Sequence, residues 1–74
     1  MNNVLNMSEL ILASHLLNSV RVGDGVTISD RFGQNLTGRA VMRGPCGWVL
    51  NMGGPHGTPG IADEQNIVSI RRKR

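Results

Sequence analysis

Two stretches decide the fold: GDGVTI at residues 23–28 and GRAVMR at residues 38–43, with a polar loop between them. Apolar residues alternate with other residues in both stretches, as they do in a strand with one buried face. Val26 and Ile28 share one side of the first stretch, and Ala40 and Met42 share one side of the second. A shorter alternation at residues 20–22 precedes the Gly-Asp-Gly turn. These patterns predict short strands at 20–22, 26–28 and 38–43.

The C-terminal half continues with strands and turns. GPCG at residues 44–47 has proline second and glycine fourth, as in a tight turn. Residues 48–52 then read as a returning strand, residues 53–60 as a long loop, residues 63–66 as a polar turn and residues 67–70 as a last strand. Four or five short strands with one long loop predict a small β-barrel over residues 20–70.

Residues 1–19 form a head without glycine, which predicts a helix over about residues 7–18. Asn6 is a capping residue with Glu9 three positions later. One broad face of this helix is apolar and comprises Leu10, Leu12, Ala13, Leu16 and Leu17. A helix of three turns needs a surface to pack on. We expect that surface to be the barrel of the same chain, with a partner protein as the alternative.

The body of the chain resembles the KOW motif of SH3-like barrels over roughly residues 20–70. The similarity lies in the Gly-Asp start at residues 23–24, the alternation after it, the loop with Phe32, and Gly38 opening the next strand. The resemblance implies a mainly β, SH3-like five-stranded small barrel with one N-terminal α-helix. KOW modules occur in NusG-type transcription elongation factors and in ribosomal proteins, where they bind RNA or proteins. By position, the contact loop is residues 30–37, with Arg31, Phe32 and Asn35 foremost.

The charge of this 74-residue chain is concentrated at its end. The net charge is +3, but four of the eight basic side chains lie at residues 71–74, so the rest carries −1. Such a basic tail either binds phosphates through counterion release or is a solvated terminus. Its members are Arg71, Arg72, Lys73 and Arg74. A single cysteine and the lack of an apparent export signal indicate a cytoplasmic protein, and no apolar run is long enough to span a membrane.

Two arginines and two aromatic residues are further candidates for binding. Arg39 and Arg43 are four residues apart on one predicted strand, so they are expected on one face, as a basic stripe or as its solvated side. Phe32 either stacks on a base or a partner, or folds inward to close the barrel, and the inward position is favoured. Trp48 is expected in the core, with its indole N–H bonded to a carbonyl.

The sequence offers little for catalysis. Cys46, His15 and His56 lack the spacing of a metal site, and the glycine-rich loop at 53–60 lacks the ending of a phosphate-binding P-loop. The acidic residues Asp24, Asp30, Asp63 and Glu64 are expected in turns. Residues 47–50 and 59–61 are loosely similar to the plasmid-type dihydrofolate reductase, a small barrel enzyme, but its pore motif is missing. We therefore expect no catalytic residue, metal or cofactor.

Two functions remain open from the sequence. The first is a nucleic-acid-associated module for RNA or DNA that serves transcription or translation. In this module the loop with Arg31, Phe32 and Asn35 contacts bases or a protein, while Arg39, Arg43 and residues 71–74 bind phosphates. The second is a protein-interaction adaptor or inhibitor, in which homo-oligomer formation through the helix or an open strand edge is possible. A reductase is a remote third.

Overall fold

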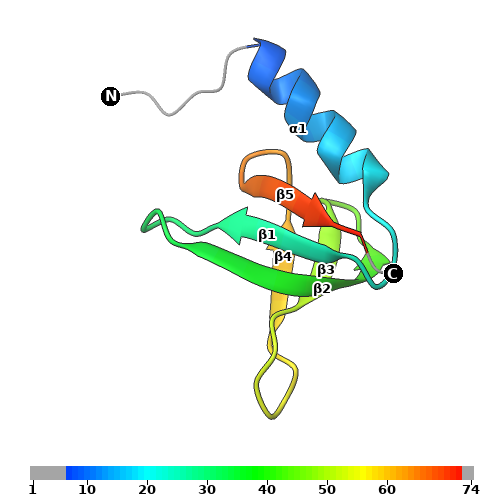
Figure 1. Cartoon of the computed structure of the whole chain (residues 1–74), viewed down its shortest axis with the longest axis vertical. Coiled ribbons are helices and arrows are strands. Elements are labelled where there is room, and N and C mark those ends of the chain that lie inside the picture. The colour runs from blue at the N-terminus through cyan, green and yellow to red at the C-terminus, as the bar shows by residue number, and fades with distance from the viewer. Residues whose placement is uncertain (1–6, 73–74) are drawn as a thin grey trace.

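One helix is followed by five strands in a single antiparallel sheet with the order β4-β3-β2-β1-β5 (Figure 1). The structure is a computed structural model that describes residues 7–72, with side chains described from residue 12 onward. The elements are α1 (Met7–Ser19), β1 (Gly25–Ser29), β2 (Asn35–Arg43), β3 (Trp48–Asn51), β4 (Pro59–Ala62) and β5 (Ile67–Arg71). The predicted mainly β class, with five strands and an N-terminal helix, is confirmed.

The central strand β1 follows its sequence pattern. Val26 and Ile28 are buried, whereas Thr27 between them is partly exposed. β1 pairs with β2 in an unbroken register, in which Val26 lies opposite Gly38 and Ser29 opposite Asn35. β2 therefore begins at Asn35, three residues before the predicted start. The predicted loop of residues 30–37 shortens to a tight connection over residues 30–34.

The strand predicted at residues 20–22 is not formed. These residues belong to a turn in which the Arg21 N–H donates to Oδ2 of Asp24 over 2.9 Å and the Asp24 N–H donates to the Arg21 carbonyl over 3.0 Å. The Gly23 N–H donates to the Ala40 carbonyl, which ties the turn to β2. Val20 is buried as the chain leaves α1, but Val22 is exposed. The aspartate bonds the backbone of its own turn, as expected, and this replaces a strand by a turn.

A β-bulge interrupts the pairing of β2 with β3. Ala40 lies opposite Leu50, but Met42, and not Val41, lies opposite the next residue of β3, Val49. The extra residue reverses the alternation beyond it, so Met42 is exposed although Ala40 is buried. The prediction that Ala40 and Met42 share one side is therefore wrong.

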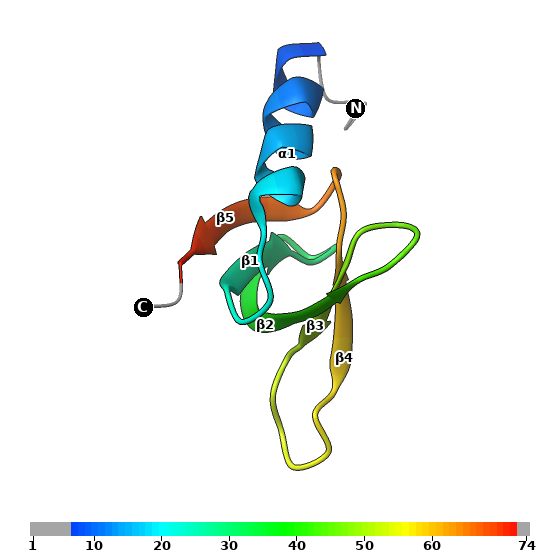
Figure 2. The same ribbon diagram turned by 90° about the vertical axis from the view of Figure 1, so that its right-hand side faces the viewer.

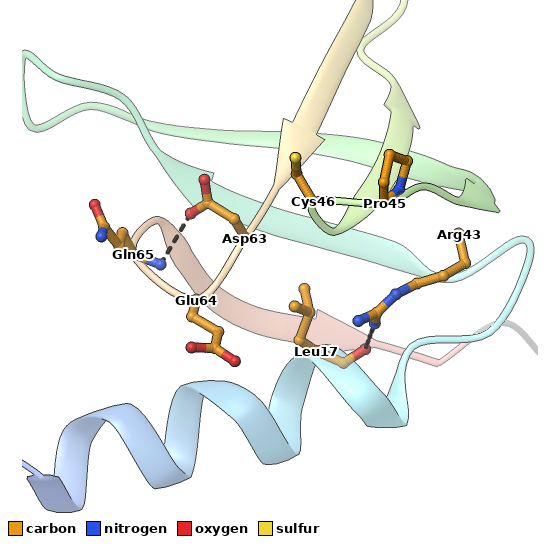
Figure 3. A pocket seen from close by; sticks show the side chains of 7 residues that line it. All are labelled: Leu17, Arg43, Pro45, Cys46, Asp63, Glu64 and Gln65. Atoms are coloured by element: carbon orange, nitrogen blue, oxygen red, sulfur yellow. Dashed lines mark hydrogen bonds between the residues drawn. The ribbon is translucent and has the colours of Figure 1, made fainter.

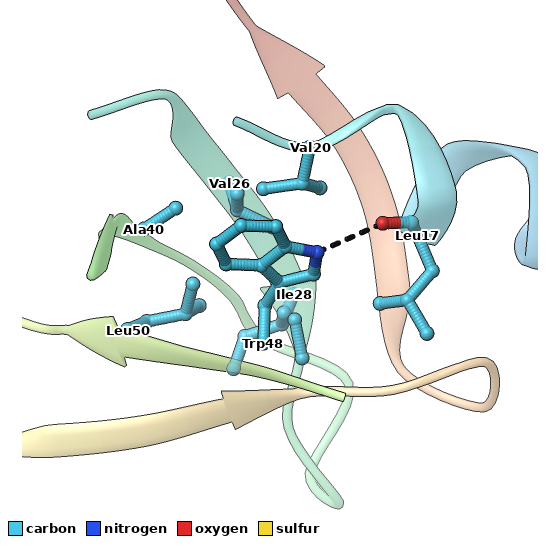
Figure 4. Packing of buried hydrophobic residues seen from close by; sticks show 8 residues of the cluster. Leu17, Val20, Val26, Ile28, Ala40, Trp48 and Leu50 are labelled. Carbon is cyan, nitrogen blue, oxygen red and sulfur yellow. Dashed lines mark hydrogen bonds between the residues drawn. The ribbon is translucent and has the colours of Figure 1, made fainter. Parts of the chain in front are cut away.

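The core lies between the sheet and the end of α1 (Figure 4). Its buried apolar residues are Leu17, Val20, Val26, Ile28, Ala40, Trp48, Leu50 and Ala62. The Trp48 indole N–H donates to the Leu17 carbonyl over 2.9 Å, which satisfies a carbonyl in the last turn of the helix. Burial of Trp48 with this hydrogen bond confirms the sequence prediction. The bond also joins α1 to β3.

The helix packs by its C-terminal end. Ala13 and Leu17, one turn apart, are buried, and α1 contacts β5. The N-terminal end points away from the sheet (Figure 2). Leu12, predicted on the packed face, is 64% exposed. The C-terminal part of the helix packs on the sheet of the same chain through Leu17, while the Asn6 cap and the Leu10 side chain lie outside the described residues.

We expect the Trp48→Phe variant to unfold more easily. It loses the hydrogen bond to Leu17 and leaves a helix-end carbonyl without this donor, at a cost of about 1–3 kcal/mol. Urea denaturation followed by far-UV circular dichroism measures the change. The Leu12→Ala control removes an exposed side chain and should stay within about 0.5 kcal/mol of the parent. Equal stability of Trp48→Phe and the parent would show that this bond does not hold α1 to the sheet.

Candidate nucleic-acid interface

The outward side of β5, β1 and β2 carries polar side chains in rows across the three strands. In the first row, Gly25 lies opposite both Arg71 and Arg39, and in the second, Thr27 lies opposite both Ser69 and Thr37. Residues directly opposite one another project from the same side of a sheet. We call this surface the polar face, and its members are Thr27, Asn35, Thr37, Arg39, Ser69 and Arg71.

In the first row, two cationic side chains lie on either side of a residue without a side chain. Arg39 and Arg71 are two strand spacings apart, about 10 Å. Gly25 between them contributes no side chain, and a recess of about 290 Å³ lies beside it, lined in part by Thr37, Arg39 and Asn51. In the second row, the hydroxyl oxygens of Thr27 and Thr37 are 2.8 Å apart and share a hydrogen bond. The face thus presents guanidinium and hydroxyl donors on a shallow surface.

No carboxylate lies on the polar face among the residues that the structure describes. Asp24 is 1% exposed and lies in the turn before β1. Asp30 closes the hairpin loop, and Asp63 and Glu64 belong to the turn between β4 and β5. Asp24, Asp30 and Asp63 thus accept backbone N–H groups within turns. The polar face itself carries the cations Arg39 and Arg71 although the chain up to Ile70 has a net negative charge.

The loop between β1 and β2 is held by Asp30. Its Oδ1 accepts hydrogen bonds from the N–H groups of Phe32 and Gln34, over 2.8 and 2.9 Å. The Asp30 N–H donates to the Gln34 carbonyl over 2.8 Å. This tight loop cannot fold back over the core, and Phe32 is 78% exposed. The favoured inward position of Phe32 is therefore wrong. Arg31 lies over the ring, with its guanidinium carbon 5.1 Å from the centroid.

Arg39 and Arg43 lie on opposite sides of the sheet. The bulge around Val41 places Arg43 opposite Trp48, on the core side, whereas Arg39 lies opposite Asn51 on the outward side. Arg43 reaches the end of α1, where its guanidinium donates to the Leu17 carbonyl over 3.4 Å (Figure 3). The predicted stripe of Arg39 and Arg43 is therefore wrong, because a strand with a bulge does not keep one period of two.

The first half of the predicted basic tail is held against the domain. Arg71 is the last residue of β5 and lies opposite Gly25. Arg72 donates to the Ser19 carbonyl over 3.2 Å, and its Nε lies 3.8 Å from Oδ2 of Asp24. Lys73 and Arg74 lie outside the described residues.

Residues predicted for the interface are thus divided. Arg39 and Arg71 lie in one row of the polar face and Asn35 lies at its other end. Arg31 and Phe32 lie at the end of the same hairpin, whereas Arg43 and Arg72 contact the helix end. The hydroxyl residues Thr27, Thr37 and Ser69 were missed. Their signal is present in the sequence, because a hydroxyl at every second position of a strand marks its outward side.

A second recess, of about 440 Å³, lies between the end of α1 and the turns at residues 44–47 and 63–66 (Figure 3). Two of its ionisable groups bind backbone atoms: Arg43 donates to the Leu17 carbonyl, and Oδ1 of Asp63 accepts from the N–H groups of Gln65 and Asn66. Glu64 also lines the recess, and Cys46 at its rim is exposed. Among the side chains that the structure describes, no three or more that could hold a metal ion come together.

Comparison with known proteins gives no family for the chain: a scan against family models finds no match, and searches of curated proteins and of solved structures find no similar protein. In the described part of the chain, no helix has the length and apolar character needed to cross a bilayer.

We expect Asp30→Ala to loosen the hairpin loop. The variant removes the acceptor of two backbone N–H groups, which costs about 1 kcal/mol and speeds hydrogen exchange at the amides of Phe32 and Gln34. Amide exchange measured by NMR tests this. Gln34→Ala keeps the Asp30 acceptor and serves as the control. If exchange at both amides is unchanged in Asp30→Ala, the loop is not held by this carboxylate.

Proposed function

We propose that the protein is a non-catalytic nucleic-acid-binding module for RNA or DNA, acting in the cytoplasm as an accessory of transcription or translation. The observation that carries this proposal is the polar face, on which Arg39 and Arg71 lie beside three hydroxyl residues with no described carboxylate. Arginine and hydroxyl side chains are common ligands of nucleic-acid phosphates. A partner of negative charge and repeating phosphate groups fits this surface best.

The resemblance to KOW modules supports the same function. The stretch that carries it, residues 23–41, contains most of the β1–β2 hairpin, which contributes Thr27, Asn35, Thr37 and Arg39 to the polar face. Membership of that family and closure of the sheet as an SH3-like barrel are part of the proposal. The resemblance and the charge distribution thus point to one surface by independent arguments.

The number of cations on the surface determines how steeply the affinity for nucleic acid falls with salt. Arg39, Arg71 and Arg31 at the hairpin tip supply three cations, and Lys73 and Arg74 follow in the sequence. Three to five phosphate contacts give a slope of log affinity against log salt of about −2 to −4.5. We expect binding that is measurable at low salt and weak at physiological salt.

We expect Arg39→Gln and Arg71→Gln each to weaken oligonucleotide binding roughly threefold to tenfold at low salt and to reduce the salt slope by about 0.7–0.9. Fluorescence anisotropy with labelled oligonucleotides over a salt series measures both values. Arg43→Gln is the matched control, because it removes the same charge from the other side of the sheet and should change binding least. An equal effect of all three variants would contradict a specific face.

A second function, as a protein-interaction adaptor that forms homo-oligomers, is favoured by one separate observation. Met42, Val49 and Ile61 form an apolar row across the outward side of β2, β3 and β4. Met42 is 55% and Ile61 is 45% exposed. Ile61→Asp distinguishes the two functions, because it should disrupt an oligomer seen by analytical ultracentrifugation while nucleic-acid binding through the polar face persists.

A further inference from the structure

Phe32 is a large apolar side chain that the fold leaves in solvent. It is 78% exposed at the tip of the β1–β2 hairpin, the highest exposure among the large hydrophobic residues that the structure describes. The Asp30 hydrogen bonds to the N–H groups of Phe32 and Gln34 hold this loop in one conformation. An exposed aromatic ring on a constrained loop is suited to binding a planar ligand, because little conformational entropy is lost when the ligand binds.

We infer that Phe32 is a stacking platform for an unpaired base and that the nucleic acid bound by this protein is single-stranded. The inference rests on the proposed function and specifies its ligand. Aromatic side chains on which bases stack, next to a cationic surface that follows the backbone, are the two elements of single-strand binding. Phe32 supplies the first element, and the polar face supplies the second.

We infer a single strand because the Phe32 ring can contact the flat face of an unpaired base but not that of a paired one. In a duplex the flat faces of the bases are stacked on one another, so a protruding ring gains little contact with them. An unpaired base exposes its flat face, and any base can stack, which makes the contact tolerant of sequence. Phe32 therefore contributes to affinity only when bases are unpaired.

Arg31 places a cation at the same point, in a loop that also holds the Asp30 carboxylate. Its guanidinium carbon lies 5.1 Å from the Phe32 ring centroid, within the range of a cation–π contact. The contact orients the ring and keeps a cation next to it. Binding of a base to Phe32 thus brings the adjoining phosphate close to Arg31, in the way that Arg39 and Arg71 meet phosphates at the other end of the hairpin.

The spacing along the hairpin fits a short segment of strand. Asn35 and Arg39 are four positions apart along β2, which is about 13 Å of extended chain. This length holds at most about four nucleotides, because about 3.4 Å is the rise per nucleotide of a stacked duplex strand and an unstacked strand is more extended. A bound strand can therefore run along β1 and β2 with phosphates over the polar face and one base on Phe32.

The experiment compares four labelled probes of about twelve nucleotides, a length within the range of single-strand sites: oligo(dT), oligo(U), an abasic strand with the same number of phosphates, and a duplex. Anisotropy is measured for the full chain and for Phe32→Leu, which keeps an apolar side chain but removes the aromatic face. Phe32→Trp keeps an aromatic face. Val22→Ala is the matched control, because Val22 is also exposed, at 68%, but lies in the turn before β1.

We expect the parent to bind oligo(dT) and oligo(U) more tightly than the abasic strand. Phe32→Leu should weaken oligo(dT) and oligo(U) binding about 5- to 150-fold, abolish the preference over the abasic strand and leave the salt slope unchanged. Phe32→Trp should keep the preference, and Val22→Ala should behave as the parent. Circular dichroism of each variant verifies folding.

Two results overturn the inference while the proposed function stands: equal binding of oligo(dT) and the abasic strand by the parent, or tighter binding of the duplex than of either single strand. Each would mean that only phosphates are recognised. If the parent binds none of the four probes at low salt, the proposed function falls together with the inference. A third result that overturns the inference is an unchanged oligo(dT) affinity in Phe32→Leu.

Discussion

β1 pairs with β2 on one side and with β5 on the other, and the rest of the structure depends on this double pairing. Because side chains alternate along a strand, the residues of β1 that enter the core determine which residues of both neighbours face outward. Val26 faces the inner side, and so do the residues opposite it, Gly38 and Ile70. Thr27 faces the outer side, as do Thr37 and Ser69 opposite it. One alternation thus builds the core and the polar face together.

The ends of the chain are joined around the turn that precedes β1. Asp24 is buried there, accepts the Arg21 N–H and lies near Arg72, which also reaches the Ser19 carbonyl at the end of α1. Trp48 and Arg43 donate to the neighbouring Leu17 carbonyl. Backbone groups at the C-terminal end of α1, which a helix leaves without internal partners, are therefore satisfied by side chains from distant segments. This arrangement places the helix on the sheet and holds Arg72 at the helix end.

The proposed function depends on how the fold distributes charge, because the net charge alone does not distinguish a binding surface from a solvated tail. The described carboxylates serve turns at residues 24, 30 and 63, where they accept backbone N–H groups. The arginines are divided between the polar face and the helix end by the bulge in β2. Arg39 and Arg71 lie on the polar face, and the loop with Asp30, Arg31 and Phe32 lies at the end of the same hairpin.

Local patterns in the sequence were sufficient for the helix, for most of the strands, for the turns built on aspartate and for burial of Trp48, because capping, alternation and turn chemistry act within a few residues. They were insufficient for the bulge at Val41, which depends on how β2 packs against β3, and this changed the side on which Arg43 lies. Val22 and Phe32 were also misplaced, since hydrogen bonds of Asp24 and Asp30 turned both segments outward. Register and burial are set by contacts between segments far apart in the chain, and these contacts bring Arg39 and Arg71 into one row.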